Sequence, residues 1–219
     1  MARDDYYASA FGKIFSAYME RPRLSRAIGW ALWGGDVKRY YESMAAIAEV
    51  SAGGTVVDCP CGAGPAFRAA PASVRYVAVD LSPSMLRRAR KRAAARNLAG
   101  VELVQADATD LPLPPASADL FLSYWGLHCF PEPAAALLEA ARVLRPDGRL
   151  VGVALVRGQD SLRQRLIQPG RGDFGRPGTQ AEIETWLTDA GFDPTDIDRS
   201  GPMLFFDAHK GRRGIGSEL

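Results

Sequence analysis

One stretch, residues 55–65, constrains the fold of this chain more than any other part of the sequence. It opens with three β-branched residues, which are typical of a buried strand, and Asp58 stands at the end of that strand. The turn that follows contains Gly62 and Gly64, and glycines permit a tight turn and let a ligand approach bare backbone. Pro65 suits the first position of a helix, where the missing N–H has no intrahelical partner anyway. Strand, glycine turn and helix start together predict a nucleotide-type site at the carboxyl end of a parallel strand.

Strand patterns alternate with helix patterns along the rest of the chain. We expect further strands at 76–80, 101–107, 119–125 and 149–156, and two last strand candidates at 194–199 and 203–210. Helices are expected at 83–97, 131–144 and 179–191, and a turn at 145–148 before the fifth strand. Ser82-Pro83 and the capping box of Thr179 and Glu182 mark two helix starts. The alternation predicts an α/β fold, a Rossmann-like doubly wound sheet with helices on both faces.

The first 50 residues are expected to be helical, with Asp36 capping a helix that runs to about Val50. One face of the earlier part is apolar and aromatic, formed by Phe11, Ile14, Phe15, Tyr18 and Met19. This stripe is typical of core packing, and the alternative is a lid that supplies aromatic walls through Tyr6, Tyr7 and Trp33. We therefore expect a helical lid or cap over 1–50, a ligand-binding domain over 51–210 and a flexible tail over 211–219.

Composition excludes several classes of function. The net charge of +2 gives no support for nucleic-acid binding, and we expect the basic side chains of 83–97 to form a solvated helix face. No apolar run reaches the roughly 18 residues of a membrane span, and we see no signal peptide. Three cysteines in such a chain favour reduced thiols in the cytoplasm, and no second pair completes a metal site.

Acids stand at three successive strand ends, at Asp58, Asp80 and Asp107. Because the carboxyl ends of parallel strands share one edge of a sheet, we expect these acids to lie around one ligand. A dinucleotide fits poorly, since Phe67 occupies the third position of the glycine fingerprint, where a small residue packs. No Gly-Lys-Ser/Thr follows the turn, which argues against a P-loop. Acids suit ribose hydroxyls, an adenine amine and a cationic ammonium or sulfonium, and S-adenosylmethionine carries all of these groups.

At these residues the sequence resembles the class I S-adenosylmethionine-dependent methyltransferases, close to the small-molecule and ubiquinone/menaquinone-type group. The resemblance rests on Val57–Gly64, Val79–Leu86, Gln105–Ala108 and Leu144–Leu150, where Asp147 replaces a glycine that the family often has. It implies a sheet of about seven strands with an antiparallel last strand. The cofactor-binding residues that motif and resemblance suggest are Asp58, Pro60, Cys61, Gly62, Gly64, Asp80, Leu81, Met85, Asp107, Ala108, Tyr124 and Trp125.

The loop after the fourth strand faces the transferred methyl group in this family, and here it contains His128. A histidine there is a candidate general base because its ordinary pKa is near neutral, and the more common alternative is that it packs or hydrogen-bonds in the loop after the strand. The expected function is methyl transfer to a small molecule, which an apolar and aromatic set of Phe11, Phe15, Trp33, Trp125 and Phe130 hints is apolar or aromatic. The alternative is a protein that binds S-adenosylmethionine and regulates without transferring the methyl group.

Overall fold

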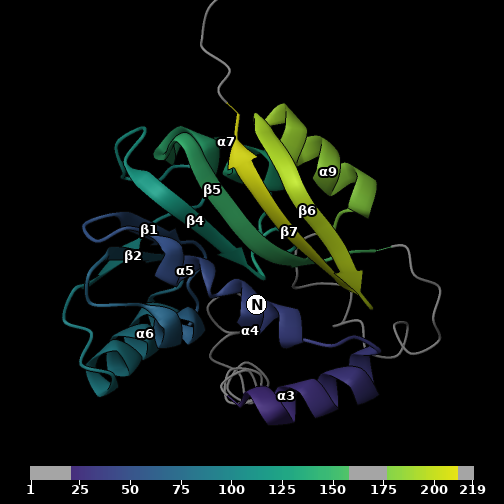
Figure 1. The fold of residues 1–219 in the computed structure, drawn as a ribbon, viewed down its shortest axis with the longest axis horizontal. Helices are drawn as coiled ribbons and strands as arrows, with labels where there is room; N and C mark the ends of the chain where they lie inside the picture. Colours follow the sequence, from purple (N-terminus) through teal and green to yellow (C-terminus); the bar gives the residue numbers. More distant parts are fainter. Residues whose placement is uncertain (1–20, 158–176, 212–219) are drawn as a thin grey trace, which may run out of the picture.

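A seven-stranded sheet in the order β3-β2-β1-β4-β5-β7-β6 forms the centre of the computed structural model (Figure 1), which describes residues 21–157 and 177–211. Its strands are β1 (Thr55–Asp58), β2 (Arg75–Asp80), β3 (Val101–Gln105), β4 (Ala118–Tyr124), β5 (Leu144–Leu155), β6 (Phe192–Ser200) and β7 (Met203–Lys210). β1 to β5 pair in parallel, and β7 runs antiparallel to both of its neighbours. The doubly wound sheet with an antiparallel last strand is confirmed.

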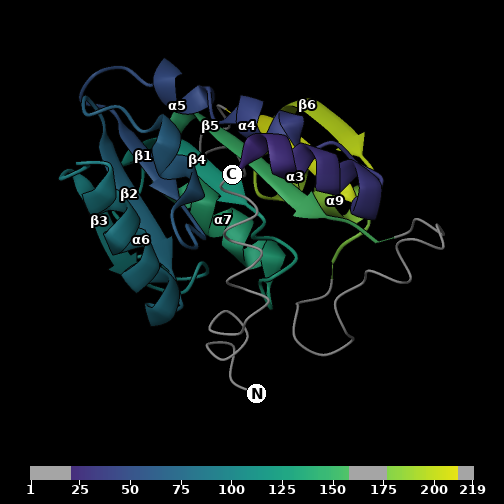
Figure 2. The ribbon, with the colours of Figure 1, turned by 90° about the horizontal axis from the view of Figure 1, so that it is seen from below.

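Helices cover both faces of this sheet (Figure 2). One face carries α7 (Pro133–Val143) and α9 (Gln180–Asp189), whose buried side chains pack with those of Val57, Phe121 and Phe206. The other face carries α4 (Lys38–Ser43), α5 (Ala46–Glu49) and α6 (Pro83–Ala95). Successive side chains of a strand point to opposite faces of the sheet, so neighbouring residues pack into the two different hydrophobic cores. The sheet is therefore buried on both faces.

The predicted helix starts are confirmed in detail. Ser82 Oγ accepts the N–H of Met85 at 3.3 Å, and Pro83 occupies the first helical position. Thr179 and Glu182 form the reciprocal capping box. On α6 the side chains of Met85, Ala89 and Ala93 are buried, so the basic residues of this helix do form its outer face.

Three local expectations need correction. The segment after the glycine turn is only a short 3₁₀ helix, η2 (Pro65–Ala69). The helix expected from Asp36 to Val50 is interrupted between α4 and α5, and Asp36 Oδ1 accepts the N–H of Lys38 at 2.8 Å. Residues 145–148, expected as a turn before the fifth strand, lie inside β5, where the pairing with β4 shifts register and Asp147 has a φ of +63°.

The N-terminal segment lies partly outside the sheet layers and partly in the core. α3 (Pro22–Ile28) and the π-helix η1 (Gly29–Trp33) lie outside the sheet layers, whereas Tyr40, Met44 and Ile47 are fully buried against the sheet. The expected aromatic stripe and lid residues Tyr6, Tyr7, Phe11, Ile14, Phe15, Tyr18 and Met19 lie outside the described residues, as do 158–176 and the tail from 212. The lid function of residues 1–50 stays a prediction.

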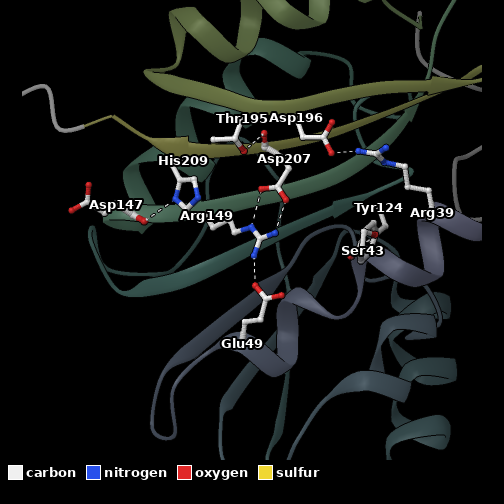
Figure 3. A network of polar contacts seen from close by, with 10 residues as sticks. All are labelled: Arg39, Ser43, Glu49, Tyr124, Asp147, Arg149, Thr195, Asp196, Asp207 and His209. Atoms are coloured by element: carbon white, nitrogen blue, oxygen red, sulfur yellow. Dashed lines mark hydrogen bonds and ion pairs between the residues drawn. The ribbon is translucent and has the colours of Figure 1, made fainter.

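Ion pairs fasten the N-terminal helices to the last strands (Figure 3). The guanidinium of Arg149 on β5 donates to both carboxylate oxygens of Asp207 on β7, at 2.8 and 2.6 Å, and also to Glu49 of α5. Arg39 of α4 pairs with Asp196 and Asp198 of β6. The last three strands of the sheet are therefore tied to the helices that precede β1.

Candidate cofactor site

The glycine turn is held between the two strands that flank β1. The N–H of Cys59 donates to the carbonyl of Leu122 at 3.0 Å, and the N–H of Cys61 donates to the carbonyl of Val79 at 2.8 Å. Both bonds continue the sheet beyond the last residue of β1, so the turn emerges at the carboxyl edge between β2 and β4. This edge is where open α/β sheets bind their ligands.

Both glycines of the turn have backbone conformations that favour glycine. Gly62 has a φ of +52° and Gly64 a φ of +76°. A side chain added at Gly62 would meet no atom within 4 Å, so the turn has open space beside its backbone there. A side chain at Gly64 would collide with the ring of Phe67, which is buried against Tyr76 at a ring distance of 5.4 Å. Phe67 fills the region that a small third residue leaves clear in dinucleotide-binding turns.

Asp80, at the end of β2, joins the glycine turn to the start of α6. Its Oδ2 accepts the N–H of Gly62 at 2.8 Å, and its Oδ1 accepts the N–H of Ser82 at 2.9 Å. These bonds fix the carboxylate in place, and each oxygen has a second lone pair for a ligand hydroxyl. The arrangement suits the two neighbouring hydroxyls of a ribose.

Asp58 is buried, and its environment differs from that of Asp80. The hydroxyl of Tyr76 on β2 donates to Asp58 Oδ2 at 2.9 Å. Burial raises the pKa of Asp58 to about 7, the Tyr76 hydrogen bond opposes the rise, and the nearby Asp80 adds to it. A buried carboxyl group with a pKa near 7 is a good partner for a ligand cation, because the cation would compensate the carboxylate for its lost hydration. Sequence reasoning missed Tyr76, and the only available signal was a hydroxyl-bearing residue in an otherwise apolar strand.

The predicted adenine side of the site is more open. Asp107 is exposed, and its Oδ1 accepts the backbone N–H and the hydroxyl of Thr109, at 2.9 and 2.8 Å. Ala108 and Met85 are buried, whereas Leu81 is 48% exposed. An exposed apolar side chain beside Asp80 fits the predicted wall for an adenosine, and the contact itself stays a prediction.

The end of β4 brings Tyr124, Trp125 and His128 to the same edge. Trp125 has a φ of +60°, an uncommon conformation for a bulky residue, and its ring lies 6.4 Å from that of His128. His128 is buried, its Nδ1 accepts the N–H of Leu155 at 3.2 Å, and burial lowers its pKa to about 4. The ring is therefore neutral at physiological pH and fastens this loop to the end of β5. The predicted base role of His128 is untested, and the low pKa makes it a weak base.

The remaining sequence predictions concern thiols, metals and membranes. Cys59 and Cys61 are buried, Cys129 is half-buried, and none of the three forms a disulfide. Within residues 21–157 and 177–211, no group of three or more His, Cys, Asp or Glu side chains gathers as a metal site would require. None of the helices in these ranges has the length and apolar character needed to cross a bilayer.

Comparison with known proteins decides the family. A family model described as a methyltransferase domain matches residues 57–152. The chain is 35% identical over 170 residues to a demethylmenaquinone methyltransferase of Clavibacter sepedonicus, covering 74% of this chain and 66% of the relative. It is 32% identical over 164 residues to a 27-O-demethylrifamycin SV methyltransferase of Amycolatopsis mediterranei, covering 71% and 60%. The chain belongs to the class I S-adenosylmethionine-dependent methyltransferases.

Solved structures share the fold of this chain. A SAM-dependent methyltransferase of Aquifex aeolicus superposes with a TM-score of 0.62 at 20% identity, over 84% of this chain and 93% of that one. The chain spans about a third to two thirds of the length of the curated relatives it matches.

The residues at the carboxyl edge fit the cofactor of this methyltransferase family, S-adenosylmethionine. Gly62 leaves open space beside the backbone, Asp80 presents two fixed carboxylate oxygens, and Asp58 offers a buried acceptor for a cation. Pro60 and Cys61 lie in the turn between them, and Pro60 also contacts the loop at Gly126. In the part of the chain that the structure describes, the site supplies acids and no clustered cations, as a sulfonium nucleoside requires and a pyrophosphate does not.

Proposed function

We propose that this chain transfers the methyl group of S-adenosylmethionine to a small apolar or aromatic acceptor. The observation that carries the proposal is the gathering of Asp58, Asp80 and an open glycine turn at one sheet edge, beside the aromatic end of β4. The sulfonium supplies an activated methyl group with a good leaving group. The protein then has to align the acceptor opposite the sulfur and exclude water.

The aromatic side chains at the end of β4 support an apolar or aromatic acceptor. Tyr40 lies 5.1 Å from Tyr124 and 5.8 Å from Trp125, measured between ring centroids. Tyr40 and Tyr124 are buried, and they support the half-buried ring of Trp125 from behind. Phe130 lines a cavity of about 10 Å³ behind β4, which is too small for an acceptor. The acceptor site therefore lies on the open side of Trp125, and the lid residues are expected to complete it. The relatives named for demethylmenaquinone and 27-O-demethylrifamycin SV agree with a small organic acceptor.

Positioning is the main contribution expected of the side chains in this loop. His128 holds the segment after β4 to the end of β5, and Gly126 lets that segment approach Pro60. A side chain at Gly126 would come within 2.5 Å of Pro60 Cδ, so the loop needs glycine there to keep its place beside the turn. We place the reacting methyl group beside this junction, opposite Trp125.

Calorimetric titration with S-adenosylmethionine and, separately, with NAD tests the cofactor class. We expect micromolar binding of S-adenosylmethionine by the wild type, weakened about tenfold to a hundredfold in Asp80→Ala, on the scale of one charge-assisted hydrogen-bond pair. No binding by the wild type, or binding of NAD instead, would overturn the proposal. Transfer of labelled methyl to a panel of quinols, phenols and fatty acids then tests the acceptor. Cofactor binding without transfer to any acceptor, at a site closed beside the methyl group, would favour a regulatory protein.

A further inference from the structure

The hydroxyl of Tyr40 is buried without a hydrogen-bond partner anywhere in the described part of the chain. The side chain is fully enclosed between α4 and the sheet, where its ring packs edge-on against Tyr124 at 5.1 Å. A phenylalanine would keep these ring contacts. An unpaired buried hydroxyl is destabilising, so the folded protein by itself gains nothing from this oxygen.

The other tyrosines of this region do have partners, which sets Tyr40 apart. The hydroxyl of Tyr41 lies 2.6 Å from Ser25 Oγ, and that of Tyr76 donates to Asp58 at 2.9 Å. The hydroxyls of Tyr124 and Ser43 are hydrogen-bonded at 3.1 Å (Figure 3). Among these tyrosines only Tyr40 has an unpaired hydroxyl, although Ser123 Oγ on β4 is also buried without a partner in the described residues. Because nearly all buried polar groups in proteins are hydrogen-bonded, the unpaired hydroxyl of Tyr40 points to a partner from outside the chain.

The surroundings of Tyr40 indicate the chemistry of that partner. Burial is the main cause that raises the pKa of the Tyr40 hydroxyl, and the neighbouring Tyr124 and Tyr41 add to the rise. Asp58, at the end of β1, also raises this pKa and Arg68, in η2, lowers it, so both charged groups lie near the hydroxyl. Asp58 can accept from a cationic group, and the Tyr40 hydroxyl and Arg68 can donate to an anionic one. A donor and an acceptor on either side of one turn match the zwitterion of an amino acid. The amino-acid end of S-adenosylmethionine carries both of these charges.

We propose that Tyr40 binds the carboxylate of the cofactor's methionine moiety through its hydroxyl, while Asp58 faces the ammonium group. The inference rests on the proposed function, because it assigns a further residue to the same cofactor site. It also gives the helix before β1 a direct part in binding. Because the Tyr40 side chain is fully buried and Arg39 ties α4 to β6, the proposal requires this six-residue helix to move aside when the carboxylate enters and then to return.

The test compares two cofactor forms that differ only in the carboxylate. S-adenosylmethionine and its decarboxylated analogue are titrated by calorimetry into the wild type, Tyr40→Phe and Tyr41→Phe. The last variant is a matched control, because Tyr41 neighbours Tyr40 on α4 and its hydroxyl is paired with Ser25. Melting temperatures of all three proteins without ligand are measured alongside.

We expect Tyr40→Phe to weaken S-adenosylmethionine about tenfold to a hundredfold, as the loss of one hydrogen bond to a charged group does. Binding of the decarboxylated analogue is expected to change by less than about twofold, and the melting temperature to be equal to that of the wild type or higher. Tyr41→Phe is expected to leave both affinities within about twofold. An equal loss for both cofactor forms, or no loss for either, would overturn the assignment of Tyr40. If the wild type bound neither form, the proposed function itself would fail.

Discussion

Asp58 shows how one residue couples cofactor affinity to pH. Its pKa of about 7 means that the carboxyl is half-protonated at neutrality before a cation arrives. A cationic ligand prefers the ionised form, so the affinity for S-adenosylmethionine should fall about tenfold per pH unit below pH 7 and be level above it. Calorimetric titrations at about six pH values between roughly pH 5.5 and 8.5 measure this profile. The facing groups Tyr76, Cys61 and Asp80 supply no positive charge that would replace the ligand.

The protonation of Asp58 should also affect the stability of the protein without cofactor. Here the pH dependence is opposite to that of cofactor affinity, because stability falls as the pH rises. Because the pKa of Asp58 is raised on folding, the folded state holds a proton that the unfolded state releases between about pH 4 and pH 7. This contribution to stability is present at low pH and is lost as the pH rises through 7. Asp58→Asn keeps an oxygen for Tyr76 and is expected to flatten both profiles. A wild-type affinity that is independent of pH would contradict the pairing of Asp58 with the ammonium group.

Substitutions at His128 can distinguish a positioning role from a role as the general base. Its Nδ1 accepts the N–H of Leu155, and an asparagine oxygen can take nearly the same place, whereas leucine cannot. We expect His128→Leu to lower the free energy of unfolding by about 1–3 kcal/mol and His128→Asn by less than about 1 kcal/mol. Because a histidine with a pKa near 4 is a weak base, His128→Asn should keep kcat within about tenfold. A larger loss of kcat in the stable asparagine variant would establish His128 as the base.

At the scale of elements, Arg149 joins β5 and β7 to the helix before β1. Its bidentate pair with Asp207 is half-buried, so Arg149→Gln leaves Asp207 without its partner. We expect this variant to lower the free energy of unfolding by about 1–3 kcal/mol in urea titrations. Glu49→Gln is the matched comparison and should cost less than about 1 kcal/mol, because Glu49 is 63% exposed. Equal effects of the two substitutions would mean that the ion pair with Asp207 contributes no more to the free energy of unfolding than the exposed pair with Glu49.

Sequence patterns predicted those elements whose signals are local. The strand ends at Asp58 and Asp80 and the cap at Ser82 each depend on neighbouring residues, and the structure has them where expected. The interruption of the helix after Asp36 and the continuation of β5 through Asp147 depend on packing against distant strands. No local pattern shows such contacts, so propensity alone predicted a longer helix and a turn.

The same difference between local and distant signals holds for the site. A glycine turn and an acid about twenty residues later can be recognised along the chain, and they are the basis for the predicted cofactor site. The hydrogen bond of Tyr76 to Asp58 and the unpaired hydroxyl of Tyr40 exist only after the sheet and α4 have come together. Charge balance and solvent exclusion at the site are therefore properties of the folded molecule.

At the scale of the whole molecule, buried thiols report global opening. Cys59 and Cys61 are each 2% exposed, and burial raises the pKa of both thiols, so the native state should not react with a thiolate-selective reagent. We expect only the half-buried Cys129 to react from the native state, and the other two at the rate of unfolding or local opening. Mass spectrometry of alkylated protein over time measures the three rates.

Cofactor binding should slow the alkylation of Cys59 and Cys61, because it stabilises the folded state in which both thiols are buried. A ligand that binds only the folded state adds about 2.7 kcal/mol at a hundred times its Kd, so alkylation of Cys59 and Cys61 should slow about a hundredfold. A Cys129→Ser variant isolates the two buried thiols and is the background for this measurement. Because both thiols belong to the glycine turn between β1 and η2, protection also reports closure of the site itself. This prediction is wrong if either thiol is alkylated rapidly in the folded protein. It is also wrong if saturating S-adenosylmethionine leaves the alkylation rates unchanged, because the glycine turn would then open independently of the sheet.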